Sequence, residues 1–173
     1  ALPLNSTLQD LSLKMIPLGE HPDAHVDWSL IFLALGKNEG LKTLKLNVRG
    51  STEEPLCTAL KDGLKMNKTL ESLKLNYCSP LDQRDESYAF WNRAFSFLRT
   101  NITLKSLAVD VQYYRTDSCR SVFCFDLAAM LQDNASLESL TVPSCGNTTI
   151  KADKYISHVT AIQHNKTLES INL

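Results

Sequence analysis

The phrase NKTLESLKL, residues Asn67 to Leu75, recurs almost unchanged as NKTLESINL, residues Asn165 to Leu173. Seven of the nine positions are identical, and the other two keep their apolar or polar character. The same pattern begins four more times, at Asn5, Asn38, Asn101 and Asn134. Successive copies are 29 to 34 residues apart. A period of this length indicates stacked supersecondary units that share one continuous core.

Each copy of the phrase predicts a short β-strand. Its apolar residues follow the order L-x-x-L-x-L, so that the last three positions alternate apolar, polar, apolar. This period of two is typical of a strand with one buried face. The side chains between the leucines therefore point to the opposite, solvent-facing side of the sheet.

A helix is expected before five of the six asparagines. The residues three, seven and ten positions upstream are apolar in every unit, apart from His158, and lie on one stripe of a helix. These residues are Leu35, Leu64, Leu98, Leu131 and Ile162; Ile31, Leu60, Ala94, Leu127 and His158; and Trp28, Cys57, Trp91, Cys124 and Tyr155. We expect the stripe to pack inward and the asparagine to close the last helical turn, where left-handed backbone is common.

These elements predict an α/β fold. Strand, loop, helix and turn repeat as a right-handed solenoid, with about six parallel strands on the concave face and five helices on the convex face. Residues 1–173 form a single domain, which we interpret as a fragment of a longer solenoid or multidomain chain. Because both ends fall inside a repeat unit, end-to-end self-association through uncapped termini is a further expectation.

The pattern resembles that of leucine-rich-repeat proteins over essentially the whole chain. Cys78 and Cys145, three residues beyond the last apolar position, complete that family's consensus in two copies. The long helix in each unit is similar to the ribonuclease-inhibitor-like subclass, which includes ribonuclease inhibitors, NOD-like receptor sensor regions, tropomodulin C-terminal domains and GTPase-activating proteins for Ran. The chain departs from ribonuclease inhibitor in its uneven periods and in lacking the N-x-L-G/D-D-x-G segment. The resemblance implies protein binding but no particular partner.

Composition argues against several other functions. A net charge of −1 lacks the basic excess that nucleic acids or anionic membranes attract. Five scattered cysteines indicate reduced thiols in the cytoplasm rather than a disulfide framework. The six glycines never cluster, and no nucleophile, phosphate-loop or dinucleotide motif occurs. We therefore predict no enzyme and no cofactor.

Three sequence features admit alternative interpretations. His21 and His25 have the spacing of a shared metal on a helical turn, but no third ligand is close in sequence, so we favour a solvated junction and predict no metal site. Cys119 and Cys124 match no common zinc pair. Six glycosylation sequons occur, and five coincide with a repeat asparagine, which the turn explains without a glycan. The sequons are at Asn5, Asn67, Asn101, Asn134, Asn147 and Asn165.

The candidate binding residues are polar strand positions and one loop. On the strands they are Thr43, Lys45, Asn47, Ser72, Lys74, Asn76, Ser106, Asp110, Ser139 and Thr141. In the loop after the fourth strand they are Tyr113, Tyr114 and Arg115, whose residue types are frequent in interface hot spots. Alternatively, the hydroxyl side chains reflect β-propensity, the lysines solvate a surface, and a tyrosine packs on its own loop.

We predict a non-catalytic protein–protein interaction module that binds a partner protein through the concave face and the loops after the strands. One alternative is a regulator of a nucleotide-hydrolysing partner, of the GTPase-activator kind, in which Arg115 acts on the bound nucleotide. Another is a structural module that caps a filament, as tropomodulins do.

Overall fold

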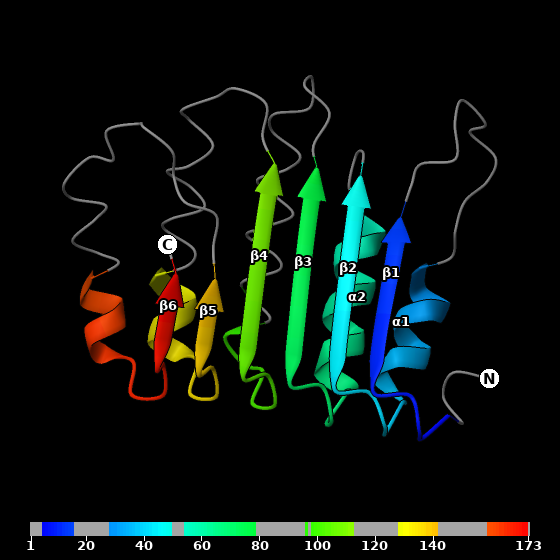
Figure 1. Cartoon of the computed structure of the whole chain (residues 1–173), viewed down its shortest axis with the longest axis horizontal. Coiled ribbons are helices and arrows are strands. Elements are labelled where there is room, and N and C mark those ends of the chain that lie inside the picture. The colour runs from blue at the N-terminus through cyan, green and yellow to red at the C-terminus, as the bar shows by residue number, and fades with distance from the viewer. Residues whose placement is uncertain are drawn as a thin grey trace.

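Six parallel strands form one sheet in chain order (Figure 1). The computed structural model describes residues 5–15, 28–49, 54–78, 96, 98–112, 128–141 and 159–172. The strands are β1 (Asp10–Met15), β2 (Thr43–Arg49), β3 (Ser72–Cys78), β4 (Ser106–Gln112), β5 (Ser139–Thr141) and β6 (Ser170–Asn172). Equivalent positions of the repeated phrase are register partners at every strand pair, as Leu44, Leu73 and Leu107 illustrate.

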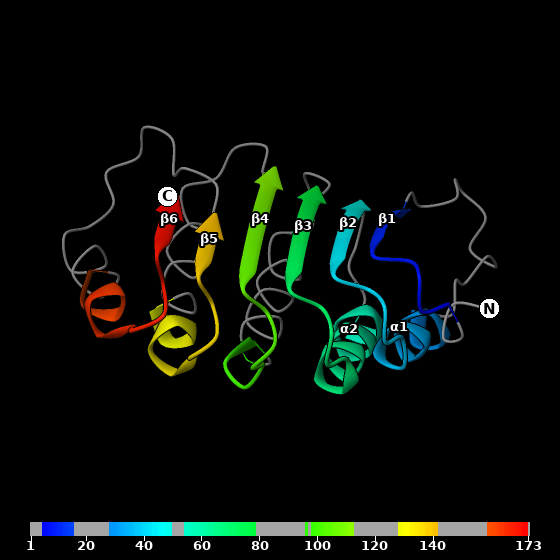
Figure 2. The same cartoon turned by 60° about the horizontal axis from the view of Figure 1, so that its bottom comes forward.

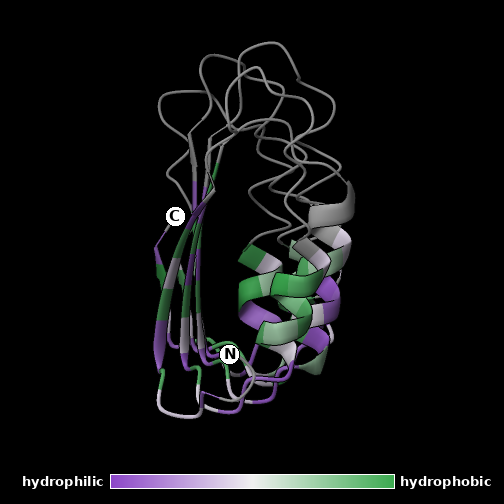
Figure 3. Cartoon of the chain, turned by 90° about the vertical axis from the view of Figure 1, so that its right-hand side faces the viewer, coloured by the Kyte–Doolittle hydropathy of each residue, from purple (hydrophilic) through white to green (hydrophobic). Residues whose placement is uncertain are grey.

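Helices cover one face of this sheet (Figures 2 and 3). They comprise α1 (Trp28–Gly36), α2 (Glu54–Met66) and the helical residues 128–133 and 159–164. Between consecutive strands the described helical residues lie on this one face, and the next strand always lies on the same side of the one before, which makes the crossovers right-handed (Figure 1). The predicted leucine-rich-repeat solenoid is confirmed. We call the sheet face opposite the helices the open face.

Four of the five expected helices are described as continuous segments. Of the helix expected before Asn101, only residues 96 and 98 are described, and both are helical.

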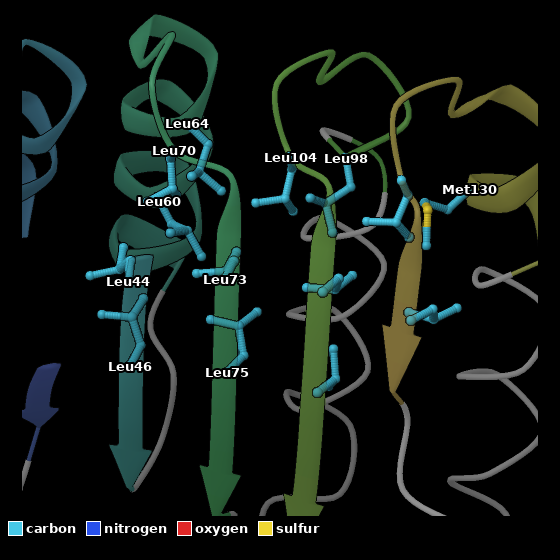
Figure 4. Packing of buried hydrophobic residues seen from close by; sticks show 14 of the residues in the cluster. Leu44, Leu46, Leu60, Leu64, Leu70, Leu73, Leu75, Leu98, Leu104 and Met130 are labelled. Atoms are coloured by element: carbon cyan, nitrogen blue, oxygen red, sulfur yellow. The ribbon is translucent and has the colours of Figure 1, made fainter. Parts of the chain in front are cut away.

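The core lies between the sheet and the helices (Figure 4). From the strands, Leu73 is fully buried and Leu46 nearly so, and from α2 both Leu60 and Leu64 point toward them. The predicted position three residues before each asparagine is buried in Leu35, Leu64, Leu98 and Leu131. Each such side chain contributes about 1.5–3 kcal/mol relative to an exposed one. The side chains predicted ten residues before the asparagines lie outside those that the structure describes.

Two large core residues fall outside the predicted stripe. Phe32 on α1 and Met130 in the segment 128–133 have at most 1% of their surface exposed. Met130 stands four residues before its asparagine, where Gly63 and Ala161 are also buried. The inward face of each helix is therefore wider than a strict spacing of three, four and seven, as expected of a helix packed between a sheet and its neighbours.

Glycines bring α1 and α2 into close contact. A β-carbon on Gly63 would lie 2.6 Å from the backbone oxygen of Phe32, and one on Gly36 would lie 3.0 Å from Cβ of Met66. Any larger residue at position 63 would push the two helices apart. The spacing of the first two units thus depends on the absence of a side chain there.

Candidate protein-interaction face

The repeat asparagines join each unit to the one before it. We call Asn5, Asn38, Asn67, Asn101, Asn134 and Asn165 the asparagine row. The side-chain oxygen of Asn67 accepts hydrogen bonds from the backbone N–H groups of Thr69 (2.9 Å) and Leu70 (2.7 Å). Its side-chain nitrogen donates to the backbone oxygens of Leu35 (2.8 Å) and Asn38 (3.1 Å). One amide thus closes its own turn and binds the previous unit.

The same arrangement recurs along the row. The side-chain nitrogen of Asn134 donates to the backbone oxygens of Leu98 (2.8 Å) and Asn101 (3.2 Å). That of Asn165 donates to Leu131 (2.7 Å) and Asn134 (2.9 Å). The sequence predicted only that the asparagine closes the helix. The structure adds the bonds between units, which no pattern within one unit reveals.

Burial of the asparagine side chain excludes a glycan at two of the sequons. Asn67 is 5% exposed and Asn134 is 4% exposed, and both side-chain nitrogens donate two hydrogen bonds. A glycan replaces a hydrogen of that nitrogen and needs access to solvent. The folded chain therefore has no room for a glycan at either residue. Asn147 lies outside the described residues.

In three units, at Thr69, Ser136 and Thr167, the residue two positions after the asparagine adds a second link to the previous unit. The hydroxyl of Thr69 donates to the backbone oxygen of Leu41 (2.9 Å), and that of Ser136 donates to Leu104 (3.0 Å). In the second unit Gly40 takes this place, and a β-carbon there would lie 2.3 Å from the backbone oxygen of Ser6. The first unit therefore packs too closely on the second for a threonine.

A row of mostly charged residues lies directly before the first residue of each strand. We call Gln9, Lys42, Glu71, Lys105, Glu138 and Glu169 the charge row. Nζ of Lys42 donates to Oε1 of Glu71 at 2.6 Å, and Nζ of Lys105 lies 3.7 Å from Oε1 of Glu138. The hydrogen bond from Lys42, then its charge, hold the pKa of Glu71 below its ordinary value, with a smaller contribution from Lys105.

The charge row was not predicted from the sequence. Its signal is the residue directly after the first leucine of each phrase, which reads lysine, glutamate, lysine, glutamate in units two to five. Such alternation becomes visible only when the six phrases are aligned as neighbouring strands.

A further ion pair, between Arg99 and Asp133, joins the ends of adjacent helical regions, and Nε of the arginine lies 2.7 Å from Oδ2 of the aspartate.

Three polar rows cross the open face. The hydroxyl row is Asp10, Thr43, Ser72, Ser106, Ser139 and Ser170. The lysine row is Ser12, Lys45, Lys74, Ala108, Thr141 and Asn172. The amide row is Lys14, Asn47, Asn76 and Asp110. All ten predicted strand residues stand in these rows, exposed or half-buried. Their role in binding is not tested by this placement. Tyr113, Tyr114 and Arg115 lie outside the described residues.

Few hydrogen bonds link these rows to the rest of the fold. The side-chain nitrogen of Asn76 donates to the side-chain oxygen of Asn47, and the hydroxyl of Ser170 donates to that of Ser139 at 2.9 Å. The side-chain oxygen of Asn76 is buried and accepts no hydrogen bond. These hydrogen bonds therefore join side chains within one row. In the asparagine row, by contrast, each side chain binds the backbone of the preceding unit.

Neither a metal cluster nor a spanning helix is found in the described part of the chain. Among these residues no three histidine, cysteine or carboxylate side chains come together to hold a metal ion. None of the described helices has the length and apolar character needed to cross a membrane. His21, His25, Cys119 and Cys124 lie outside the described ranges.

The chain is similar in fold to a solved structure. No protein-family model matches the chain, and no curated protein matches it in sequence. Among solved structures, the chain is similar to "Leiomodin-1 Actin-Binding Site 2 (ABS2)", with a TM-score of 0.57 and 17% sequence identity. The match covers 93% of this chain and 82% of that one. At this identity the likeness concerns the fold.

Proposed function

We propose that the chain is a non-catalytic protein-interaction module that binds a partner protein through the open face of its sheet. One observation carries the proposal. The side chains of the asparagine row, such as Asn67, are hydrogen-bonded to the backbone of the preceding unit, whereas the side chains of the open-face rows make few hydrogen bonds to the rest of the fold. Polar side chains that the fold does not use are available to a partner. An extended sheet face is also the surface that solenoid proteins offer for binding.

Actin is the candidate partner that a specific observation favours. The similar solved structure is described as an actin-binding site, and it shares the fold over most of both chains. Actin binding also agrees with the filament-capping alternative that the sequence resemblance implies. For the GTPase-activator alternative, Arg115 lies outside the described residues and no other feature supports it.

Two related proposals have their own support. We place the chain in the ribonuclease-inhibitor-like subclass because α2 spans 13 residues. We propose a cytoplasmic location because the buried sequons at Asn67 and Asn134 exclude glycans there. End-to-end self-association stays a prediction. Leu30 lies on α1, at the end of the solenoid that β1 forms, and its side chain is 64% exposed. Substituting Leu30 is therefore the first way to test self-association.

Site-specific photocrosslinking tests the binding face. A photoreactive phenylalanine at Ser106, on the open face, should crosslink actin, whereas the same residue at Lys61, exposed on α2, should not. Replacing Ser106 by tryptophan should then abolish co-sedimentation with actin filaments and binding to monomeric actin. Crosslinking only from position 61 would reject the open face. Absence of crosslinks from both positions, with no binding to either form of actin, would reject actin as the partner.

A further inference from the structure

Two lysines stand side by side at the centre of the open face. Lys45 on β2 and Lys74 on β3 are register partners, so their α-carbons are about 4.8 Å apart. Like charges at directly opposed positions of a sheet destabilise it. The pairing of Lys45 with Lys74 therefore does not stabilise the fold. In the charge row, by contrast, lysine and glutamate alternate on neighbouring strands and form ion pairs.

No carboxylate neutralises the pair. Among the described residues, Lys42, Arg99 and Lys105 form ion pairs, whereas neither Lys45 nor Lys74 has one. The nearest acidic positions of the open face are Asp10 on β1 and Asp110 on β4. Each stands one strand across and two residues along from a lysine, so that the two α-carbons are about 8 Å apart by sheet geometry. Among the described residues, neither aspartate forms an ion pair with either lysine.

The surroundings leave the two ammonium groups accessible. Lys74 is exposed and Lys45 is half-buried. On the far side of Lys74 the row continues with Ala108, which is too short to cover it. Thr43 and Ser72 stand two residues before the two lysines on β2 and β3, and they offer hydroxyl donors on the same face. Positive charge with hydroxyl donors beside it is complementary to a carboxylate.

We infer that the open face recognises an acidic segment of a partner polypeptide, whose neighbouring carboxylates bind Lys45 and Lys74. The inference rests on the proposed binding face and specifies the chemistry of its partner. The segment lies across β2 and β3, with its acidic residues above the lysine row. Asp10 and Asp110 flank this centre with negative charge, so they disfavour further acidic residues at either side and fix the register.

A defined peptide tests the inference. Fluorescence anisotropy with labelled octaglutamate should show saturable binding that weakens as salt is added, whereas octaglutamine should not bind. The double variant Lys45→Gln/Lys74→Gln should bind octaglutamate about tenfold more weakly or worse. The matched control is Lys61→Gln/Lys65→Gln, which removes two neighbouring charges from the exposed side of α2 and should change binding by less than about twofold.

A second variant gives the opposite sign. Lys45→Glu/Lys74→Glu should lose octaglutamate and gain octalysine. Circular dichroism verifies that each variant is folded. The inference fails if the unmodified chain ignores octaglutamate, if octaglutamine binds equally well, or if the control pair loses as much affinity as the open-face pair. Should crosslinking from Ser106 still capture a partner in that case, the binding face stands and only its preference for acidic segments is rejected.

Discussion

The asparagine row and the lysine row are both polar, and both recur across the units, yet they differ in what they contact. Asn67 makes four hydrogen bonds to backbone groups, two of them in the previous unit, and is buried. Lys74, on the strand that follows, lies on the open face and is exposed. Polar residues of one repeat can thus serve stability or remain free for binding, depending on whether they stand in the buried turn or on the open face.

Removing a buried amide from the asparagine row should have the largest effect. Asn67→Ala leaves the buried backbone N–H groups of Thr69 and Leu70 without their acceptor, and it removes one of the two donors from the backbone oxygens of Leu35 and Asn38. We therefore expect a loss of about 3–4 kcal/mol in the free energy of unfolding. Urea denaturation followed by circular dichroism measures it. Asn5→Ala is the control, because Asn5 occupies the same position but is exposed, and it should cost about 1 kcal/mol or less. Equal losses would contradict the proposed role of the row between units.

The contact between α1 and α2 gives the next effect. Helix propensity alone predicts that Gly63→Ala gains about 1 kcal/mol. Because the new β-carbon would meet the Phe32 backbone oxygen at 2.6 Å, we expect instead a loss of about 2 kcal/mol. Lys61→Ala, exposed on the same helix, should stay within about 0.5 kcal/mol of the original chain. A gain in stability at position 63 would show that the helices separate without cost.

The charge row should show a smaller effect that depends on pH. The pKa of Glu71 is lowered in the folded chain, so its stabilising effect is complete above the unfolded pKa and disappears as pH falls through the folded pKa. Glu71→Gln should therefore lower the melting temperature slightly at neutral pH and low salt. The difference should vanish in acid and in high salt. A difference that persists in acid would mean that the side chain acts by packing rather than by charge.

The six-phrase pattern was sufficient to predict the sheet, its register and the open-face rows. Leucines that alternate with polar residues specify which side of a strand is buried, and equal spacing within each phrase aligns the strands. When the six phrases are aligned, Lys45 and Lys74 occupy the same position of neighbouring strands, and the strand register agrees.

Contacts between units were harder to predict, for a physical reason. The donors and acceptors of the asparagine row are backbone groups some 30 residues distant, such as the Leu35 oxygen that accepts from Asn67. Backbone groups have no sequence signature, so only the stacking distance reveals them. Phe32 and Met130 were missed similarly, because the width of a helix's buried face depends on its neighbours. The loop residues Tyr113, Tyr114 and Arg115 stay a prediction.

Lys45 and Lys74 of the lysine row do not stabilise the fold, whereas the buried asparagines of the asparagine row do. The most direct test is the free energy of unfolding of Lys45→Gln/Lys74→Gln, measured by urea denaturation beside the original chain. Relief of like-charge repulsion predicts no loss and a gain of up to about 0.5 kcal/mol. A loss comparable to that of Asn67→Ala would mean that the fold itself depends on the two lysines, and it would contradict their assignment to partner binding.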